Sequence, residues 1–183
     1  APANQPRFDY DPLTGDFLGL LLETSRTNDV VSSQDIGGTL WSVGAGITVT
    51  PNSATAPDGT NTADRVSFVN DNIYYNGPAA AATTTYTYSI YVKDGGTDLY
   101  FQEIDDNGFG GLRYQTRFVF STKTLTISGS SVDRMRAPIY QELPNGWFRI
   151  IQTFTTLNGG GGFKISNRNF TQDNFLWGAQ LEI

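Results

Sequence analysis

The chain has 183 residues, of which 38% are hydrophobic and 13% aromatic, and a formal net charge of −6. This length and apolar content are enough for one domain with a buried core, whereas the acidic balance disfavours a nucleic-acid partner, which needs a basic surface. No apolar run is long enough to cross a bilayer, so we expect no membrane insertion. The absence of His and Cys excludes Ser-His-Asp and Cys-His nucleophiles and most zinc sites.

The N-terminal region is expected to form an extended arm that ends in a turn. Pro12 presets φ at the second position of that turn, and Gly15 supplies a permissive last position. The apolar run at 19–24 is then typical of a buried strand. We therefore expect residues 1–183 to form a single β-sandwich domain, with residues 1–16 as its N-terminal arm and turn.

Short strand-like runs follow along the rest of the chain, and Asn-Gly or Asp-Gly pairs, which are strong hairpin signals, separate many of them. The expected strands are 47–50, 63–69, 72–76, 86–93, 99–105, 114–120, 124–128, 139–143, 147–155, 162–165 and 175–182. The alanine-rich segment 77–85 contains Pro78 and a Thr triplet, which limit it to about one helical turn. This pattern predicts an all-β fold, an antiparallel two-sheet β-sandwich.

The strand expected at 86–93 has a clear period of two. Alternation assigns one set of side chains to the core, namely Tyr86, Tyr88, Ile90 and Val92. The opposite set, which faces outward, is Thr87, Ser89, Tyr91 and Lys93. An outward face with hydroxyls, an aromatic ring and an ammonium group is polar and aromatic at once, which favours contact with a partner molecule.

Two later strands extend this division into inner and outer faces. In the strand at 147–155, Phe148 and Ile150 are expected to face the core and Arg149 to face outward. In the strand at 175–182, strict alternation divides the side chains into Trp177, Ala179 and Leu181 on one face and Gly178, Gln180 and Glu182 on the other. Trp147 and Trp177 are expected to be buried near the ends of the sheets rather than to serve as ligand platforms.

Several segments spread over nearly the whole chain resemble tail fibre and tailspike proteins of bacteriophages and prophages. They are RFDYDPLTG at 7–15, GLLLE at 19–23, RTN at 26–28, Trp41 with GITVT at 46–50, APDGT at 56–60, YSIYVK at 88–93, NGWFR at 145–149 and WGAQLE at 177–182. That family resembles the jelly-roll carbohydrate-binding modules of polysaccharide-degrading enzymes. The resemblance implies a jelly roll with a face or loop-rimmed groove for a glycan, and a location in the virion, outside the cell.

A glycan site needs flat rings for the apolar faces of sugars and planar polar side chains for pairs of hydroxyls. The candidate ligand-binding residues on expected outward faces are Tyr91, Lys93, Gln102, Arg149 and Gln180. Candidate stacking rings are Trp41, Tyr74, Tyr75, Tyr100, Tyr114 and Tyr140, although most aromatic residues of a sandwich belong to its core. Tyr91 and Lys93 are the leading candidates because they share the outward face of one strand.

Acidic residues offer two further readings. Glu103, Asp105 and Asp106 could supply a glycosidase carboxylate pair, but Asp105-Asp106-Asn107-Gly108 is typical of a solvated turn, so we expect no enzyme. The resemblance also implies a structural calcium ion, with Glu23, Asp58, Asp64 and Glu182 as oxygen donors to consider. Ordinary surface carboxylates are the alternative, and the metal is left open.

These observations predict a non-catalytic, lectin-like carbohydrate-binding domain of a phage tail fibre or tailspike that attaches to host-surface or environmental polysaccharide. Its partners would be a glycan and, within a fibre, two further copies in a homotrimer. The alternative is a structural or oligomerisation domain without a sugar site, in which the Tyr-rich outward faces form a subunit interface. A small hydrolase or lyase is a third reading, which requires facing carboxylates, or a Tyr and an Arg, in a deep groove.

Overall fold

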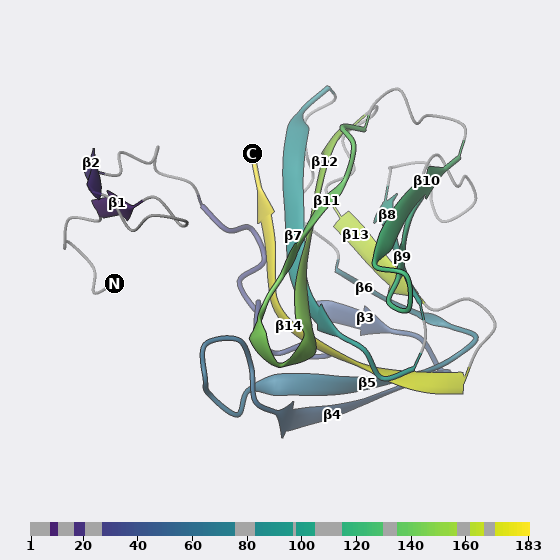
Figure 1. Cartoon of the computed structure of the whole chain (residues 1–183). Helices are drawn as coiled ribbons and strands as arrows, with labels where there is room; N and C mark the ends of the chain where they lie inside the picture. The colour runs from purple at the N-terminus through teal and green to yellow at the C-terminus, as the bar shows by residue number, and fades with distance from the viewer. Residues whose placement is uncertain are drawn as a thin grey trace.

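The computed structural model describes residues 8–10, 17–20, 27–75, 83–96, 98–104, 115–129, 135–156, 162–166 and 171–183. Regular structure in this part of the chain is β-strand, apart from a short 3-10 helix at Pro144–Gly146. Two antiparallel six-stranded sheets form a sandwich (Figure 1), which confirms the expected all-β jelly-roll class. No helix in the described ranges is long and apolar enough to cross a membrane.

The two sheets are called sheet I and sheet II here, and each is given in spatial order. Sheet I consists of β10 (Thr124–Ser128), β9 (Gln115–Val119), β8 (Leu99–Ile104), β13 (Gly162–Ser166), β6 (Asn72–Tyr75) and β3 (Trp41–Val43). Sheet II consists of β11 (Ile139–Glu142), β12 (Trp147–Thr155), β7 (Thr85–Lys93), β14 (Thr171–Glu182), β5 (Ala63–Val69) and β4 (Ile47–Ala54). The chain crosses repeatedly from one sheet to the other, so strands distant in sequence lie side by side.

A separate two-stranded antiparallel sheet precedes the sandwich. It pairs β1 (Phe8–Tyr10) with β2 (Phe17–Leu20), and Figure 1 draws it to the left of the two large sheets. The strand expected at 19–24 is therefore found earlier, and residues 21–24 lie outside the described part. Residues 11–16, which carry the predicted turn, also lie outside it, so the assignment of 1–16 as arm and turn stays a prediction.

The expected strands agree closely with the observed ones. The ranges 63–69, 124–128 and 147–155 match β5, β10 and β12 residue for residue. Asn145 and Gly146 both have positive φ, at 62° and 78°, in the connection from β11 to β12, as the Asn-Gly signal predicts. The strand β3 was not expected, because three residues are too few to show a period. The strand β14 begins at Thr171, four residues before the expected start.

The core lies between the sheets and is made by one face of each strand. On β7, the four side chains assigned to the core by alternation are all at most 2% exposed. They meet apolar side chains that project from sheet I, chiefly Leu99, Phe101, Phe118, Ile73 and Ile165. The opposite faces of both sheets are therefore the surfaces available to a partner.

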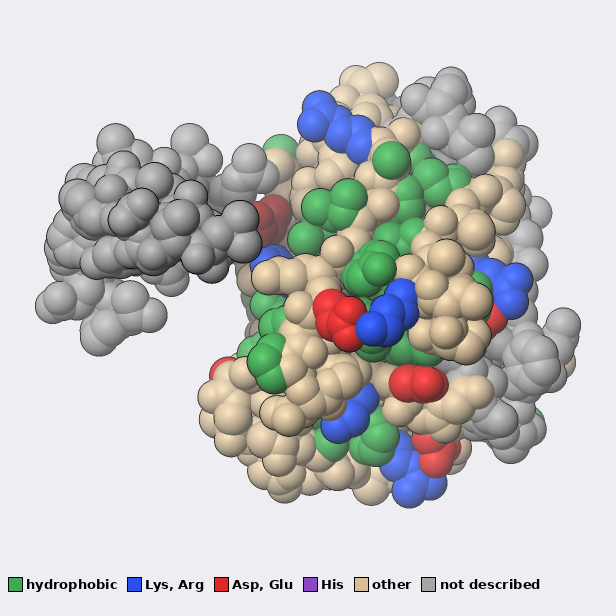
Figure 2. Space-filling model, in the orientation of Figure 1, with side chains coloured by type: hydrophobic (Ala, Val, Ile, Leu, Met, Phe, Trp, Pro, Cys, Tyr) green, Lys and Arg blue, Asp and Glu red, His purple; other side chains and the backbone are tan. Residues whose placement is uncertain are grey.

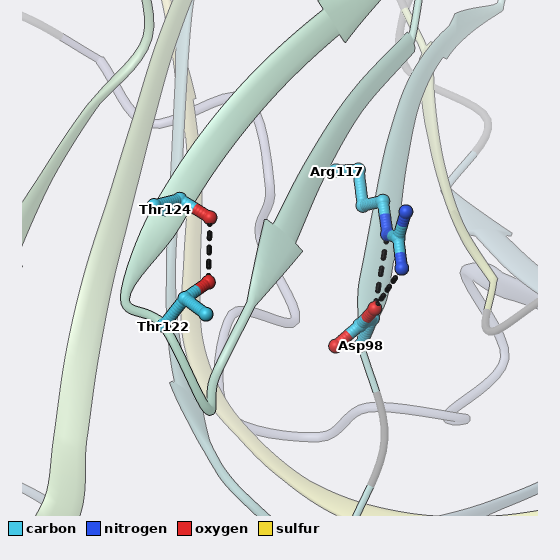
Figure 3. A network of polar contacts seen from close by, with 4 residues as sticks. All are labelled: Asp98, Arg117, Thr122 and Thr124. Atoms are coloured by element: carbon cyan, nitrogen blue, oxygen red, sulfur yellow. Dashed lines mark hydrogen bonds and ion pairs between the residues drawn. The ribbon is translucent and has the colours of Figure 1, made fainter.

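Charged pairs lie at the surface. Figure 2 shows hydrophobic side chains interrupted by charged side chains of both signs on the face turned to the viewer. Lys123, in the β9–β10 turn of sheet I, reaches Glu142 on β11 of sheet II with Nζ 2.7 Å from Oε1. On sheet I, Arg117 donates through Nε and Nη2 to Asp98 (Figure 3), and this contact raises the pKa of Arg117. Exposed pairs of this kind contribute little to stability.

Candidate functional site

Four of the five predicted ligand-binding residues lie on the outer face of sheet II, on the adjacent strands β12, β7 and β14. In the strand register, Arg149 of β12 is opposite Tyr91 of β7, which is in turn opposite Trp177 of β14. The next row places Gln180 of β14 opposite Ser89 of β7. Because side chains directly opposite each other on one face lie about 5 Å apart at Cβ, these residues form one surface.

A β-bulge on β14 is what brings Gln180 to this surface. The register of β14 against β7 shifts between Trp177 and Gln180, and Gly178 in the bulge has φ of +61°. The extra residue reverses the alternation, so Trp177 and Gln180 share the outer face while Ala179 and Leu181 enter the core at 0% exposure. The expectation that Trp177 shares a face with Ala179 and Leu181 is therefore wrong, since it assumed an unbroken period of two.

Four residues, Ser89, Tyr91, Arg149 and Gln180, form what is called the Arg149 cluster here. Nη2 of Arg149 donates to Ser89 Oγ at 3.0 Å and to Gln180 Oε1 at 2.8 Å, and Ser89 Oγ donates to Gln180 Oε1 at 3.2 Å. The guanidinium carbon lies 5.5 Å from the centre of the Tyr91 ring, within cation–π range. The guanidinium is thus held by two side-chain acceptors and an aromatic ring.

The positive charge of Arg149 has no counter-ion in the described part of the chain. The carboxylates of Asp173, Asp98 and Glu142 are each within ion-pair distance of a different cation. Nε of Arg149 is enclosed, and no described residue accepts a hydrogen bond from it. A half-buried charge without a counter-ion carries an electrostatic penalty, which an anionic ligand would relieve.

Aromatic side chains border the Arg149 cluster on one side. The Trp177 and Tyr91 rings meet edge to face with their centres 5.3 Å apart. The indole of Trp177 donates to Thr62 Oγ1 at 2.9 Å, and that of Trp147 donates to the Thr55 carbonyl at 3.1 Å. The segment 55–62 therefore folds over this end of sheet II and, with Ala56, leaves Trp147 only 1% exposed. Trp147 is buried as predicted, whereas Trp177 is half-buried and borders the cluster.

Lys93 and Gln102 do not join the Arg149 cluster. Lys93 lies on the same face in the row of Trp147, and its Cε is 3.9 Å from the point that a Cβ on Gly146 would occupy. Its side chain is thus directed to the β11–β12 turn. Gln102 lies on β8 in sheet I, is 4% exposed and donates through Nε2 to Gln115 Oε1 at 2.7 Å. A single site around Arg149 therefore does not include Gln102.

The candidate stacking rings are distributed over several environments. Trp41 and Tyr75 belong to the core and contact each other edge to face, so they are not available to a ligand. Tyr100 lies on the outer side of sheet I under the Arg117 guanidinium, and Tyr140 packs on Phe118 at the sandwich edge. Tyr74 is half-buried on the outer side of sheet I, and Tyr114 lies outside the described residues.

The acidic candidates whose side chains the structure describes are Asp58, Asp64 and Glu182. Within the described ranges there is no group of three or more acidic side chains that could hold a metal ion. Asp64 is 1% exposed and accepts hydrogen bonds from the backbone amides of Ile36 and Asn52, at 2.8 and 2.9 Å. Burial raises its pKa, although those two bonds act in the opposite direction. The Thr60 hydroxyl and amide, in contrast, lower the pKa of exposed Asp58.

Of the remaining acidic candidates, the structure describes the side chain of Glu182 alone. Glu182 lies on β14 in the row of Thr87. Glu23, Asp105, Asp106 and the side chain of Glu103 lie outside what the structure describes, so both the glycosidase pair and the calcium site stay untested there.

Sequence analysis missed two features of this site, the bulge on β14 and the hydrogen bond between Ser89 and Arg149, and only the bulge had a signal in the sequence. A glycine inside a strand pattern, as at Gly178, indicates a bulge, and a bulge would have placed Trp177 and Gln180 together. Ser89 was correctly placed on the outward face, but nothing in a single strand predicts that its hydroxyl would fix Arg149 from the neighbouring strand.

The structure defines a jelly-roll β-sandwich by its strand order, and comparison with known proteins adds resemblances at low identity. No protein-family model and no curated protein sequence matches the chain. Its solved structural neighbours include the enzymatically active domain of tailspike protein 4 of bacteriophage CBA120, at a TM-score of 0.44 and 14% identity. That match covers 85% of this chain but 21% of the tailspike chain, so this chain spans about a fifth of the tailspike structure.

Two other neighbours are binding modules. The CBM22-1 xylan-binding domain of Paenibacillus barcinonensis Xyn10C has a TM-score of 0.46 and 13% identity, over 78% of this chain and 84% of that one. The family 11 carbohydrate-binding module of Clostridium thermocellum Lic26A-Cel5E has a TM-score of 0.33 and 15% identity, over 85% and 96%. Xylan binding is a property of the Xyn10C domain and does not transfer to this chain at such identity.

Proposed function

We propose that this domain binds carbohydrate without catalysis, through the outer face of sheet II around Tyr91, Arg149 and Gln180. The observation that carries the proposal is the Arg149 cluster itself. It combines a guanidinium and an amide, which suit sugar hydroxyls, with the Tyr91 ring, and Trp177 stands beside it. Sugars are recognised by this combination of planar polar groups and aromatic rings.

The sequence motifs bear on where the domain acts. The segments that resemble tail fibres and tailspikes support a place in a phage tail, where the domain would attach the virion to host-surface polysaccharide. A single shallow site binds weakly, because protein hydrogen bonds merely replace those to water. A homotrimeric fibre would present three such sites and raise the avidity by about 10²–10⁴.

A glycan microarray tests the proposal with two matched variants. Tyr91→Leu removes the flat ring but keeps apolar bulk over Trp177, and we expect it to lose glycan binding while the protein stays folded. Tyr140→Leu makes the same change in a ring at the sandwich edge, 38% exposed, and should bind as the wild type does. Equal binding by wild type and Tyr91→Leu would remove Tyr91 from the site.

A subunit interface is the second candidate function. Ile139 on the edge strand β11 is 59% exposed and lies opposite Ile151 on the outer face of sheet II. Apolar groups at such a position are typical of surfaces that bury against another chain. Light scattering on the isolated domain separates the two functions: a stable trimer that is lost in Ile139→Asp, without glycan binding, favours the interface.

A further inference from the structure

We infer that the carbohydrate bound at the Arg149 cluster carries a carboxylate, as a uronic acid does, and that Arg149 is the residue that recognises it. This inference rests on the proposed function and narrows its ligand from any glycan to an acidic one.

Arg149 has N–H donors that no described residue uses. A guanidinium has five N–H donors and no acceptor. Two of them are used, since Nη2 donates to Ser89 and Gln180. Nη1 donates to no residue that the structure describes and is not an enclosed atom, whereas Nε, which is also unused, is enclosed by the protein. The hydrogens of Nη1 are therefore the ones that an oxyanion can accept.

The amide of Gln180 also has donors that no described residue uses. Its Oε1 accepts from both Ser89 and Arg149, which fixes the orientation of the group. Its Nε2 makes no hydrogen bond within the described ranges, so two more donors accompany the guanidinium. A carboxylate, which only accepts hydrogen bonds, matches the unused N–H donors of Arg149 and Gln180.

The described residues beside Arg149 bring no competing charge. Its two cross-strand neighbours on the outer face are neutral, namely Tyr91 on β7 and Gln141 on β11. Of the carboxylates described on this face, Asp173 is paired with Arg65 at 2.8 Å, and Glu182 lies one row beyond Gln180. No described carboxylate lies within ion-pair distance of Arg149, so its charge is open to a ligand.

The net charge of −6 does not oppose this assignment. Exposed charges farther apart than about 8–10 Å are screened at physiological ionic strength. Contact with an anion at the cluster is governed by Arg149 instead. The guanidinium of Arg149, which has no counter-ion among the described residues, suits a singly charged group such as the carboxylate of a uronic acid.

Matched pairs of polysaccharides test the inference. The full chain is titrated with polygalacturonate, alginate and hyaluronan, each beside its carboxyl-reduced form, which keeps the sugar backbone and loses the charge. We expect at least one of the three to bind about tenfold or more tightly than its reduced form, as a hydrogen bond to a charged group implies. Poly-L-glutamate, which carries carboxylates without sugar, should not bind.

Three variants locate the effect. Arg149→Gln should abolish the preference for the acidic polymer, and Arg149→Lys should keep the charge but recover only part of the preference, because an ammonium lacks the planar fork. Arg65→Gln alters an exposed arginine of the same sheet face that is already paired with Asp173, and should leave the preference unchanged. The wild-type comparison needs no variant, so a folding defect would not obscure the result.

The outcomes separate the inference from the proposed function. Equal affinity for acidic and reduced polymers, retention of the preference in Arg149→Gln, or equal binding of poly-L-glutamate would each overturn the carboxylate assignment. In the first of these cases, Tyr91-dependent binding to the reduced polymers would leave carbohydrate binding standing. The lack of binding to any polymer in the wild type, together with a negative glycan array, would overturn both.

Discussion

Gly178 determines where the side chains after it on β14 point. Its φ of +61° is one that residues with a Cβ rarely adopt, and an added Cβ would lie 3.0 Å from Cδ2 of Tyr91. The residue is therefore required twice, for the bulge and for the close approach of a ring in the site. A single atom at this position would disturb both the strand and the Arg149 cluster.

We predict that Gly178→Ala lowers the free energy of unfolding by about 2–3 kcal/mol, through the left-handed backbone and the contact with Tyr91. Gly59→Ala is the matched control, because Gly59 has φ of +87° but no atom within 4 Å of the added Cβ. It should lose about 1 kcal/mol. Denaturant unfolding measures both, and equal losses would show that the contact with Tyr91 is not significant.

Asp64 is a buried carboxylate with a structural role. It accepts hydrogen bonds from the backbone amides of Ile36 and Asn52 and so joins the two segments that contain them. In Asp64→Asn, one amide N–H₂ would face a backbone N–H, so a buried donor loses its acceptor. We predict a loss of about 1–3 kcal/mol at neutral pH in denaturant unfolding. A variant as stable as the wild type would mean that the two bonds contribute nothing.

The pKa of Asp64 predicts a pH dependence of definite sign. Its pKa is raised above 3.8 in the folded state, so the native protein holds the proton more tightly than the unfolded chain. The stability that wild type has over Asp64→Asn should therefore be largest at low pH and decrease as pH rises through the range above 3.8. Asp58, whose pKa is lowered by Thr60, should show the opposite slope when Asp58→Asn is compared with wild type.

At the scale of elements, the segment 55–62 is fixed to sheet II by two indole hydrogen bonds. Trp147 of β12 donates to the Thr55 carbonyl, and Trp177 of β14 donates to the Thr62 hydroxyl. The segment thus closes one end of the outer face and leaves the Arg149 cluster beside its edge. We expect carbohydrate binding and stability to be coupled through Trp177, because its indole fixes the segment and its ring borders the Arg149 cluster.

Replacing each indole by phenylalanine should show how much each of the two tryptophans contributes to the free energy of unfolding. Trp147→Phe leaves a cavity at a site 1% exposed and removes a bond to a backbone carbonyl, so we predict a loss of about 2–3 kcal/mol. Trp177→Phe alters a half-exposed ring and should lose about 1 kcal/mol or less. Thermal unfolding gives the order, and a larger loss for Trp177→Phe would contradict this account of the loop.

At the scale of the whole molecule, the two sheets meet through an apolar core, and a buried polar link crosses it. Thr116 of sheet I donates through Oγ1 to Oε1 of Gln152 on sheet II, and both residues are at most 4% exposed. The Gln152 amide also donates to the carbonyls of Arg136 and Thr153. Such a link between layers fixes their relative position, because a shift would leave Oε1 of Gln152 without its donor.

Thr116→Val keeps the shape of the side chain and removes the hydroxyl. We predict a loss of about 1–3 kcal/mol, since a buried amide oxygen is left without a donor. Thr85→Val makes the same change in an exposed hydroxyl pair with Thr155 and should leave the free energy of unfolding nearly unchanged. Similar values for the two variants in urea unfolding would contradict a role for the interior bond.

The sequence by itself determined most of the strands and, on β7 and β12, which side chains face outward. Alternation is a local property, because each strand residue points opposite to its neighbour whatever lies beside the strand. Tyr91 and Arg149 could therefore be placed on the outward side, and three strands could be bounded to the residue. The hairpin at Asn145 and Gly146 was equally local, since it depends on which residues tolerate positive φ.

Only the tertiary structure decided which outward residues meet. The register that sets Arg149 beside Tyr91 and Ser89 beside Gln180 joins strands about 60 to 90 residues apart in the chain, and no local pattern specifies it. The bulge at Gly178 reversed one face, and the separation of the sheets removed Gln102 from the cluster. Local sterics fix which way a side chain points, whereas long-range pairing fixes its neighbours, and a binding site consists of neighbours.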